Sequence, residues 1–396
     1  MTFIPKASGT ERPQPPAAPG GLPGRQVRTP PARPEAHTAT VVLTIVGIVV
    51  LAQLLFLVFA YLASAIGVAS VIGCGILALV PLAIVLFAVR WIDRWDPEPL
   101  AARWFAFLWG AAAAVSIALI IDLGAQLVDA VDGSAPASQF MASVVRAPLV
   151  EESAKGLGVL LICLVARRTF DGPVDGVVYA ATVAAGFAFV ENITYFGSAL
   201  VHGGGVGLAV TFVLRGLLSP FAHVMFTSCT GIALGLAVRR PGAWRILVFF
   251  VCGLAAAATM HSLWNSAAYL ARGFWGYYLV VQVPLFAIAV VLVVVLRRRE
   301  RVLTHDRLAE YARAGWFSPE EVRMLSTSRG RRNALGWARG RPDGAAIMKR
   351  FVRDATHLAW VRQRIVSGNR IDEARADETA LLTNITAERD ALSRLP

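Results

Sequence analysis

The chain has 396 residues, of which 56% are hydrophobic and only 16% are charged, and its formal net charge is +12. A soluble protein of this length is rarely so apolar, so the composition excludes an ordinary soluble enzyme. The basic residues lie between and after the apolar runs. This distribution favours a membrane surface over nucleic acid as the charged partner.

The first segment, residues 1–38, is rich in Pro, Gly, Ala and Arg and shows no apolar periodicity. Such a segment cannot bury enough surface to offset the entropy of ordering, so we predict a disordered cytosolic leader. The first apolar run begins near Thr40 and lasts about 25 residues, longer than the core of a cleavable signal peptide. We therefore expect this run to stay in the membrane.

Eight apolar stretches in the central part of the chain are long enough to cross a bilayer as helices. They cover roughly residues 40–65, 67–90, 104–128, 139–166, 176–200, 207–238, 246–271 and 274–296. Backbone groups in lipid must be hydrogen-bonded within their own segment, and the alternating pattern of a β-barrel is absent. The sequence thus predicts an all-α polytopic membrane domain over residues 39–296, with about eight transmembrane helices.

Basic residues gather at alternate ends of these predicted helices. One side collects the leader arginines and those at 90, 94, 103, 167, 168, 239, 240, 245, 297–299 and 301, whereas the other side has only Arg146 and Arg272. The positive-inside rule then places both termini in the cytosol, in agreement with an even number of helices.

From Arg301 onward the composition is that of a soluble segment, with 18 basic and 12 acidic residues and thus a net charge of +6. Ser318 is a good N-cap, and Glu321 three residues later completes a predicted capping box. Residues 308–316 and 351–365 also look helical. We predict a basic, helical cytosolic tail over residues 297–396 that rests on anionic headgroups or a partner and contains no catalytic constellation.

Polar clusters interrupt the predicted fourth to seventh membrane helices, where each ionisable side chain costs at least a few kcal/mol. Glu151 and Glu152 precede Lys155 by four and three residues, so one ammonium can pair with either carboxylate. Adjacent carboxylates in a low dielectric cannot both ionise at low cost, which makes one of them a candidate general base. The alternative is an ion pair that only joins helices.

The next helix carries Glu191 and Asn192 in the string GFAFVENITYF. Glu191 is a candidate catalytic acid, although it would also neutralise Arg215 on the following helix. Asp175, at the predicted cytosolic mouth of the fifth helix, and Arg215 are candidate supporting residues, because a paired charge is cheaper to bury than a single one.

Two histidines follow on separate helices. His223 lies three residues after Pro220, which frees backbone carbonyls and lets the helix bend around a cavity. Asn265 lies one turn after His261, so the two side chains point the same way. Counting about 1.5 Å per residue from the predicted helix ends places Glu151, Glu191 and both histidines in one layer of the membrane. This shared depth is the geometric condition for a common site, whereas a lone buried histidine is usually a hydrogen-bonded core residue.

These residues carry a resemblance to a known family. The strings WIDRWDPEPL, EESAK, DGPVDGVVYAATVAAGFAFVENITYF, RGLLSPFAHVMFTS and MHSLWN occur in this order over about residues 90–270. They resemble the successive motifs of the PrsW family of bacterial intramembrane proteases, which is distantly similar to the CAAX prenyl proteases and bacteriocin-processing membrane proteases. The leader and the tail lie outside this core. The segment WIDRWDPEPL itself is typical of an interfacial anchor, and a substrate-docking segment is the alternative.

The resemblance implies a set of catalytic positions. These are the paired glutamates Glu151 and Glu152, Glu191 of the FxxxEN motif, His223, and His261 with Asn265 of the HxxxN motif. It also implies a place in the bacterial inner membrane and the first cut of a single-span membrane protein such as an anti-sigma factor. The expected partners are that substrate and membrane lipids, without nucleic acid, and the oligomeric state stays open.

Two mechanisms remain open at this stage. In one, Glu151 deprotonates water, Glu152 and Lys155 set its charge, and His223, His261 and Asn265 hold the oxyanion. In the other, Glu191, His223 and His261 bind a zinc ion that activates the water, although no HExxH motif is present. Polar residues at this depth also suit a proton-coupled transporter, but the sequence shows no internal repeat. A non-enzymatic membrane scaffold is the third class.

Overall fold

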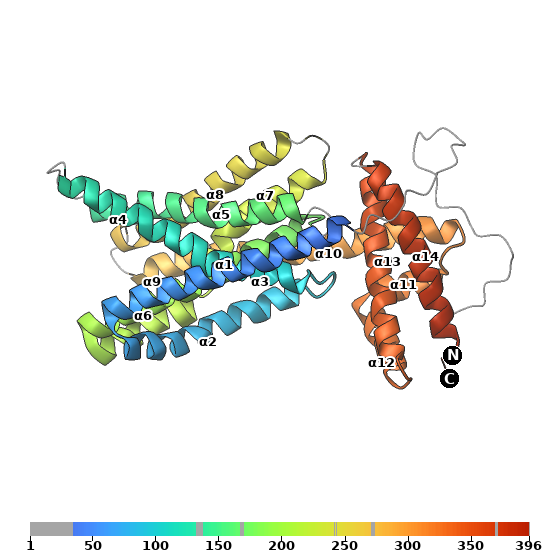
Figure 1. Ribbon diagram of the computed structural model, residues 1–396, viewed down its shortest axis with the longest axis horizontal. Helices are drawn as coiled ribbons and strands as arrows, with labels where there is room; N and C mark the ends of the chain where they lie inside the picture. Colours follow the sequence, from blue (N-terminus) through green and yellow to red (C-terminus); the bar gives the residue numbers. More distant parts are fainter. Residues whose placement is uncertain are drawn as a thin grey trace. The chain divides into compact units, whose positions relative to one another are not determined.

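The computed structural model describes residues 35–131, 138–166, 170–240, 242, 244–270, 274–368 and 371–395. Every regular element in these residues is helical, which confirms the predicted all-α class (Figure 1). The described residues form two compact units. The first, here called the membrane unit, contains the described residues of 35–238 and 242–293, and the second, the tail unit, contains those of 294–395 with 239–240. The predicted leader lies outside the described residues, apart from residues 35–38, with which the first helix begins.

The membrane unit consists of long helices with short π-helical turns, written η, set into them. In chain order these are α1 (Glu35–Ile66), α2 (Val68–Ile92), α3 (Leu100–Leu108), η1 (Trp109–Ala114), α4 (Val115–Val131), η2 (Met141–Arg146), α5 (Ala147–Val165), α6 (Pro173–Thr211), η3 (Phe212–Leu218), α7 (Ala222–Val238), α8 (Trp244–Leu270), α9 (Phe274–Tyr277), η4 (Tyr278–Gln282) and α10 (Val283–Arg313). The last of these, α10, continues into the tail unit.

Within the described residues, six helical segments are long and apolar enough to cross a membrane. One of them, Pro173–Val238, reverses at Gly204, whose φ of 61° suits a residue without a side chain, so it corresponds to two of the predicted spans. Helix α5 is not among the six because it carries Glu151, Glu152 and Lys155. The polytopic architecture is therefore confirmed, while the orientation of the termini stays a prediction.

Helix α6 forms the centre of the membrane unit and packs against α2, α3, η1, α5 and α7. Small residues permit these contacts. A Cβ atom on Gly110 of η1 would lie 1.9 Å from the backbone oxygen of Val183, and one on Gly176 would lie 2.0 Å from that of Gly231. Close backbone approach of this kind is how helices associate in lipid. Because α7 also packs on α8, and α5 on both, helices α5 to α8 surround one interior region.

The segment WIDRWDPEPL forms the turn between α2 and α3. The Asp93 carboxylate accepts hydrogen bonds from the backbone N–H of Glu98 (2.9 Å) and from the Arg103 guanidinium (3.1 Å). The buried Glu98 carboxyl accepts one from the hydroxyl of Tyr179 on α6 (2.6 Å). Asp93 therefore holds the turn to the start of α3, and Glu98 fastens it to α6, the helix that carries Glu191.

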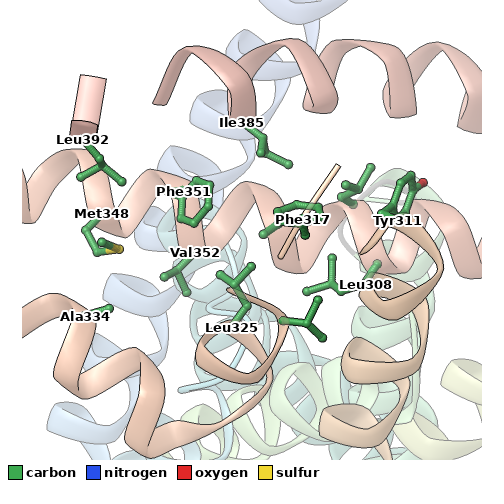
Figure 2. Close-up of a cluster of buried hydrophobic side chains, with 14 of the residues drawn as sticks. Leu308, Tyr311, Phe317, Leu325, Ala334, Met348, Phe351, Val352, Ile385 and Leu392 are labelled. Atoms are coloured by element: carbon green, nitrogen blue, oxygen red, sulfur yellow. The ribbon is translucent and has the colours of Figure 1, made fainter. Parts of the chain in front are cut away.

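The tail unit is built from the end of α10 and helices α11 (Pro319–Ser326), α12 (Ser328–Arg339), α13 (Gly344–Val366) and α14 (Ile371–Ser393). Its core contains the buried side chains of Leu308, Leu325 and Phe351 (Figure 2). The predicted capping box is confirmed. The Ser318 hydroxyl accepts from the N–H of Glu321 (3.1 Å), and the Glu321 carboxylate accepts from the N–H of Ser318 (2.8 Å).

One carboxyl group of the tail unit lies in an unfavourable electrostatic setting. The side chain of Glu388 on α14 is 11% exposed, and its ion pair with Arg350 is long at 3.7 Å. Burial, together with the negative charge of Asp354 on α13, raises the pKa of Glu388 to about 7. This group therefore retains its proton at a pH where an exposed glutamate is ionised.

Candidate active site

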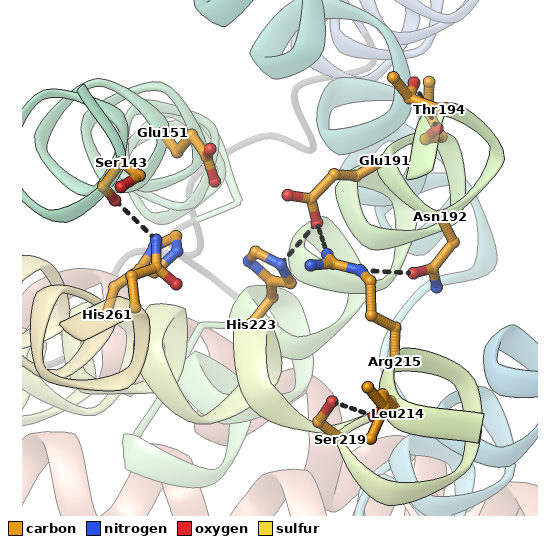
Figure 3. A network of polar contacts seen from close by, with 12 residues as sticks. Ser143, Glu151, Glu191, Asn192, Thr194, Leu214, Arg215, Ser219, His223 and His261 are labelled. Carbon is orange, nitrogen blue, oxygen red and sulfur yellow. Dashed lines mark hydrogen bonds and ion pairs between the residues drawn. The ribbon is translucent and has the colours of Figure 1, made fainter. Parts of the chain in front are cut away.

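The polar residues of helices α5 to α8 meet around one cavity of about 100 Å³. Glu151 reaches it from α5, Glu191 from α6, His223 from α7, and His261 with Asn265 from α8. Figure 3 shows Glu151, Glu191 and the two histidines turned toward a common space. A cavity of this size holds several water molecules.

The two adjacent glutamates face different surroundings. Glu151 lines the cavity, is 14% exposed, and makes one ion pair with the described residues, 3.3 Å from the ammonium of Lys155. Glu152 is fully buried. Its Oε1 accepts from Lys155 (2.7 Å) and lies 3.1 Å from Nδ1 of His261, while its Oε2 accepts from the hydroxyl of Thr227 on α7 (2.8 Å). The Glu151 carboxyl group therefore faces the cavity, whereas the Glu152 carboxyl group is bound to Lys155, His261 and Thr227.

The partners of the two imidazoles determine their tautomers. A carboxylate only accepts hydrogen bonds, so Nδ1 of His261 carries the proton toward Glu152 and Nε2 keeps its lone pair. Nε2 of His223 lies 2.7 Å from Glu191, and its Nδ1 lies 3.1 Å from the ammonium of Lys155, which only donates. Neutral His223 and His261 thus have their ring N–H groups bound to carboxylates, which leaves neither for an oxyanion.

Glu191 has two roles at once. Its Oε2 accepts from the Arg215 guanidinium at 2.6 Å as well as from His223 (Figure 3). Arg215, in the π-helical turn η3, also donates to Asn192 at 3.4 Å and lies 3.7 Å from the ring centroid of Tyr195. Such a network holds the Glu191 carboxylate, and through it the His223 ring, in a single orientation.

The side chain of Asn265 forms a hydrogen bond with the backbone. Its Nδ2 donates to the carbonyl oxygen of Ser143 in η2 at 2.8 Å, and the residue also lines the cavity. A carboxamide has two donor hydrogens, so at most one is left for a substrate carbonyl.

Three of the cavity residues could hold a divalent metal ion, which would have to displace the Lys155 ammonium from Nδ1 of His223. Ligand atoms of Glu151, His223 and His261 all lie within 4.8 Å of one another. Two imidazoles and one carboxylate form a known catalytic zinc set. Each imidazole also has a carboxylate on its other nitrogen, Glu152 behind His261 and Glu191 behind His223, as metal-bound histidines usually do. The predicted set of metal ligands had Glu191 as its carboxylate. In the structure the carboxylate grouped with the two histidines is that of Glu151, and Glu191 pairs with Arg215.

The formal charges around the cavity do not cancel. Three carboxyl groups, on Glu151, Glu152 and Glu191, face two cations, Lys155 and Arg215, so full ionisation with neutral imidazoles leaves one net negative charge, which a proton on one carboxyl group would cancel. The Lys155 ammonium is fully buried and lies 4.1 Å from the ring centroid of Phe187. In a low dielectric a net negative charge of this kind attracts a further cation.

The predicted supporting residue Asp175 does not join the site. It lies at the start of α6, where its carboxylate accepts from the backbone N–H groups of Asp171 (2.7 Å) and Gly172 (2.8 Å). Sixteen residues separate it from Glu191, about 24 Å along a helix. Conversely, the sequence did not lead us to predict Thr227 or Ser143 as site residues. The position of Thr227, four residues after His223, indicates that both lie on one face of the helix, whereas Ser143 contributes only a backbone carbonyl.

The comparisons with known proteins bear on the same part of the chain. The model of the PrsW family, described as intramembrane metalloproteases, matches residues 98–300, about half of the chain and all of the site. The chain belongs to the PrsW family. It is similar to Protease PrsW of Clostridioides difficile (34% identity over 156 residues, 39% of this chain), of Geobacillus kaustophilus (32% over 196 residues, 47%) and of Bacillus subtilis (32% over 145 residues, 37%).

These matches differ in how much of each relative they cover. The chain spans 62% of the C. difficile protein and 60% of the B. subtilis protein, less than two thirds of each, and 75% of the G. kaustophilus protein. No solved structure matches the chain significantly. Membership of the family therefore rests on the sequence core that carries the glutamates and histidines.

Proposed function

We propose that this protein is an intramembrane protease that hydrolyses a peptide bond in a single-span membrane protein, making the first cut in a substrate such as an anti-sigma factor. The observation that carries the proposal is the convergence of Glu151, His223 and His261 on one small cavity. The names of the relatives, each a Protease PrsW, support the same reaction class. They favour hydrolysis over the transporter and scaffold alternatives.

The metal-dependent version assigns a role to each residue. A zinc ion held by Glu151, His223 and His261 would polarise the scissile carbonyl and make bound water more acidic. Glu152 fixes the His261 ring through Nδ1, and Thr227 fixes Glu152. Glu191 lines the cavity with one oxygen bound to Arg215 and His223, and its other oxygen receives the proton of the attacking water.

The metal-free version has its own supporting observation. The Lys155 ammonium lies 3.1 Å from Nδ1 of His223 and 3.3 Å from Glu151. This ammonium therefore already contacts two of the three residues that would bind the metal ion. In this version Glu151 takes the proton of the water, and the second amide hydrogen of Asn265 donates to the oxyanion. The carboxylates behind both histidines favour the metal-dependent version.

Cleavage and metal content together test the proposal. The full chain is co-expressed with a tagged single-span membrane protein, purified in detergent and examined by elemental analysis, with Glu151→Gln as the matched variant. Chelator-sensitive cleavage by wild type, lost in Glu151→Gln despite normal membrane insertion, supports the metal-dependent protease. Chelator-resistant cleavage by metal-free protein supports the second version. If Glu151→Gln cuts as fast as wild type, the assignment of the site is wrong.

We also propose that the chain lies in the bacterial inner membrane with both termini in the cytosol. The arginines that follow directly on the apolar part of α10 support this orientation. Reporter fusions at each terminus, one active only in the cytosol and one only outside, test it. Activity of the external reporter at either end would reverse the assignment.

A further inference from the structure

A second cavity lies in the tail unit, against one face of α10. It has a volume of about 360 Å³ and is lined by Val295, Arg298, Arg299 and Val302 of that helix and by Gln363 of α13, among others. Val295 precedes the adjacent Arg298 and Arg299 by three and four residues, and Val302 follows them by four and three, so the four positions form a single stripe along the helix. We call this cavity the α10 groove.

The stripe lies where α10 changes from apolar to basic. Residues 283–296 of the helix contain no charged side chain, and Arg297, Arg298, Arg299 and Arg301 follow immediately. A helix of this pattern leaves the hydrocarbon at its first arginines. Along its own axis, the α10 groove therefore begins at the level where phospholipid headgroups lie.

The lining of the α10 groove combines two exposed arginines with exposed apolar surface, and it contains one acidic side chain, Asp306, which lies 3.2 Å from His305 and next to Arg307 in the chain. Arg298 and Arg299 are exposed and make no hydrogen bond or ion pair with the part of the chain that the structure describes. By contrast, Arg307 at the far end is bound to Glu310 and to Oε1 of Gln363. Val295 is 38% exposed and Val302 58% exposed. A ligand that fits both features carries an anionic group and a hydrocarbon part.

We propose that the α10 groove is a binding site for an anionic phospholipid, with the phosphate between Arg298 and Arg299. An acyl chain then lies along Val295 toward the apolar part of α10, and the glycerol region covers Val302. Guanidinium groups suit this task because they donate several hydrogen bonds to one phosphate. The carboxamide nitrogen of Gln363 can donate to headgroup hydroxyls, since its recorded side-chain hydrogen bond uses Oε1. The apolar wall distinguishes this site from one for free phosphate.

Native mass spectrometry of the full chain in detergent tests the site with phosphatidylglycerol, phosphatidylcholine and glycerophosphoglycerol as probes. The test variant is Arg298→Gln with Arg299→Gln. The matched control is Arg329→Gln with Arg332→Gln, which removes the same charge from exposed positions on α12. At about 1 kcal/mol per arginine near an anionic surface, the test variant should bind phosphatidylglycerol about thirtyfold more weakly than wild type. The control should bind like wild type.

Further arms separate the sources of binding. The variant Arg298→Lys with Arg299→Lys keeps both charges and should retain most of the wild-type affinity for phosphatidylglycerol. The proposal is overturned if the control variant loses as much affinity for phosphatidylglycerol as the test variant. It is also overturned if wild type binds phosphatidylcholine as tightly as phosphatidylglycerol, or if the test variant binds phosphatidylglycerol like wild type. Glycerophosphoglycerol binding as tightly as the intact lipid overturns it as well, because the apolar wall would then contribute nothing. All variants are compared at matched thermal stability.

Discussion

The contrast between Glu151 and Glu152 gives the sharpest prediction, because replacing each by glutamine changes charge without changing size. Glu152 is fully buried and contacts Lys155 (2.7 Å), Thr227 (2.8 Å) and His261 (3.1 Å). Removing one partner of a buried ion pair costs about 3 to 5 kcal/mol. Within the described part of the chain, Glu151 makes one ion pair, at 3.3 Å from Lys155, so its loss should cost about 1 kcal/mol of folding free energy.

The effects on catalysis should run the other way. Glu151 lines the cavity, and the loss of a catalytic carboxylate lowers the rate about 100-fold to 10,000-fold. Glu151→Gln should therefore be nearly as stable as wild type and almost inactive. Glu152→Gln should be much less stable, with any residual activity limited by the amount of folded protein and by a less constrained His261 ring.

Two measurements on the same detergent preparation check this contrast. Chemical unfolding followed by tryptophan fluorescence gives the free energy of unfolding, and cleavage of a tagged single-span substrate gives the rate. Glu320→Gln serves as control, because this exposed residue of α11 pairs with Arg323 at the surface. The reasoning fails if Glu152→Gln unfolds like the control, or if folded Glu151→Gln retains more than about a tenth of the wild-type rate.

Three further outcomes follow from particular contacts. In the metal-dependent version, wild type should contain about one zinc ion per chain by elemental analysis, and His261→Ala should abolish this content. His202→Ala, which removes an exposed histidine, should keep it. Gly110→Ala places a Cβ 1.9 Å from a backbone oxygen of α6 and should lower the free energy of unfolding by at least about 1 to 3 kcal/mol, while Gly124→Ala, with nothing within 4 Å, should not. The raised pKa of Glu388, about 7, means that the folded state holds this proton more tightly than the unfolded state. Wild type should therefore lose stability relative to Glu388→Gln as the pH rises from about 4.5 to 7, and parallel thermal unfolding curves over that range would contradict this.

Much of the membrane unit was predictable from local properties of the sequence. Apolar runs set the helices, and the reversal at Gly204 falls between the predicted spans at 176–200 and 207–238. The capping box at Ser318 followed from residue types three positions apart. The groups in the cavity were also identified as candidates, because ionisable side chains on apolar helices are costly enough to indicate a purpose.

The grouping of those candidates was less predictable. The sequence reading placed Glu191 with the histidines as metal ligands, whereas the structure groups them with Glu151 and pairs Glu191 with Arg215. Arg215 was a visible partner for Glu191, but its location in a π-helical turn changes the direction of its side chain. A turn of this kind inserts an extra residue, which a count based on ideal helices does not include.

The sequence by itself determined that this protein is a polytopic helical chain with acids, amides and imidazoles on its central helices, because hydropathy and helical period are local. Only the tertiary structure decided that Glu151 faces the cavity while Glu152 binds Lys155, Thr227 and His261. Adjacent residues on a helix point about 100° apart, so this division depends on how α5 is rotated against its neighbours. Close contacts at small residues such as Gly110 and Gly176 help to fix how these helices pack, and they depend on distant parts of the chain meeting.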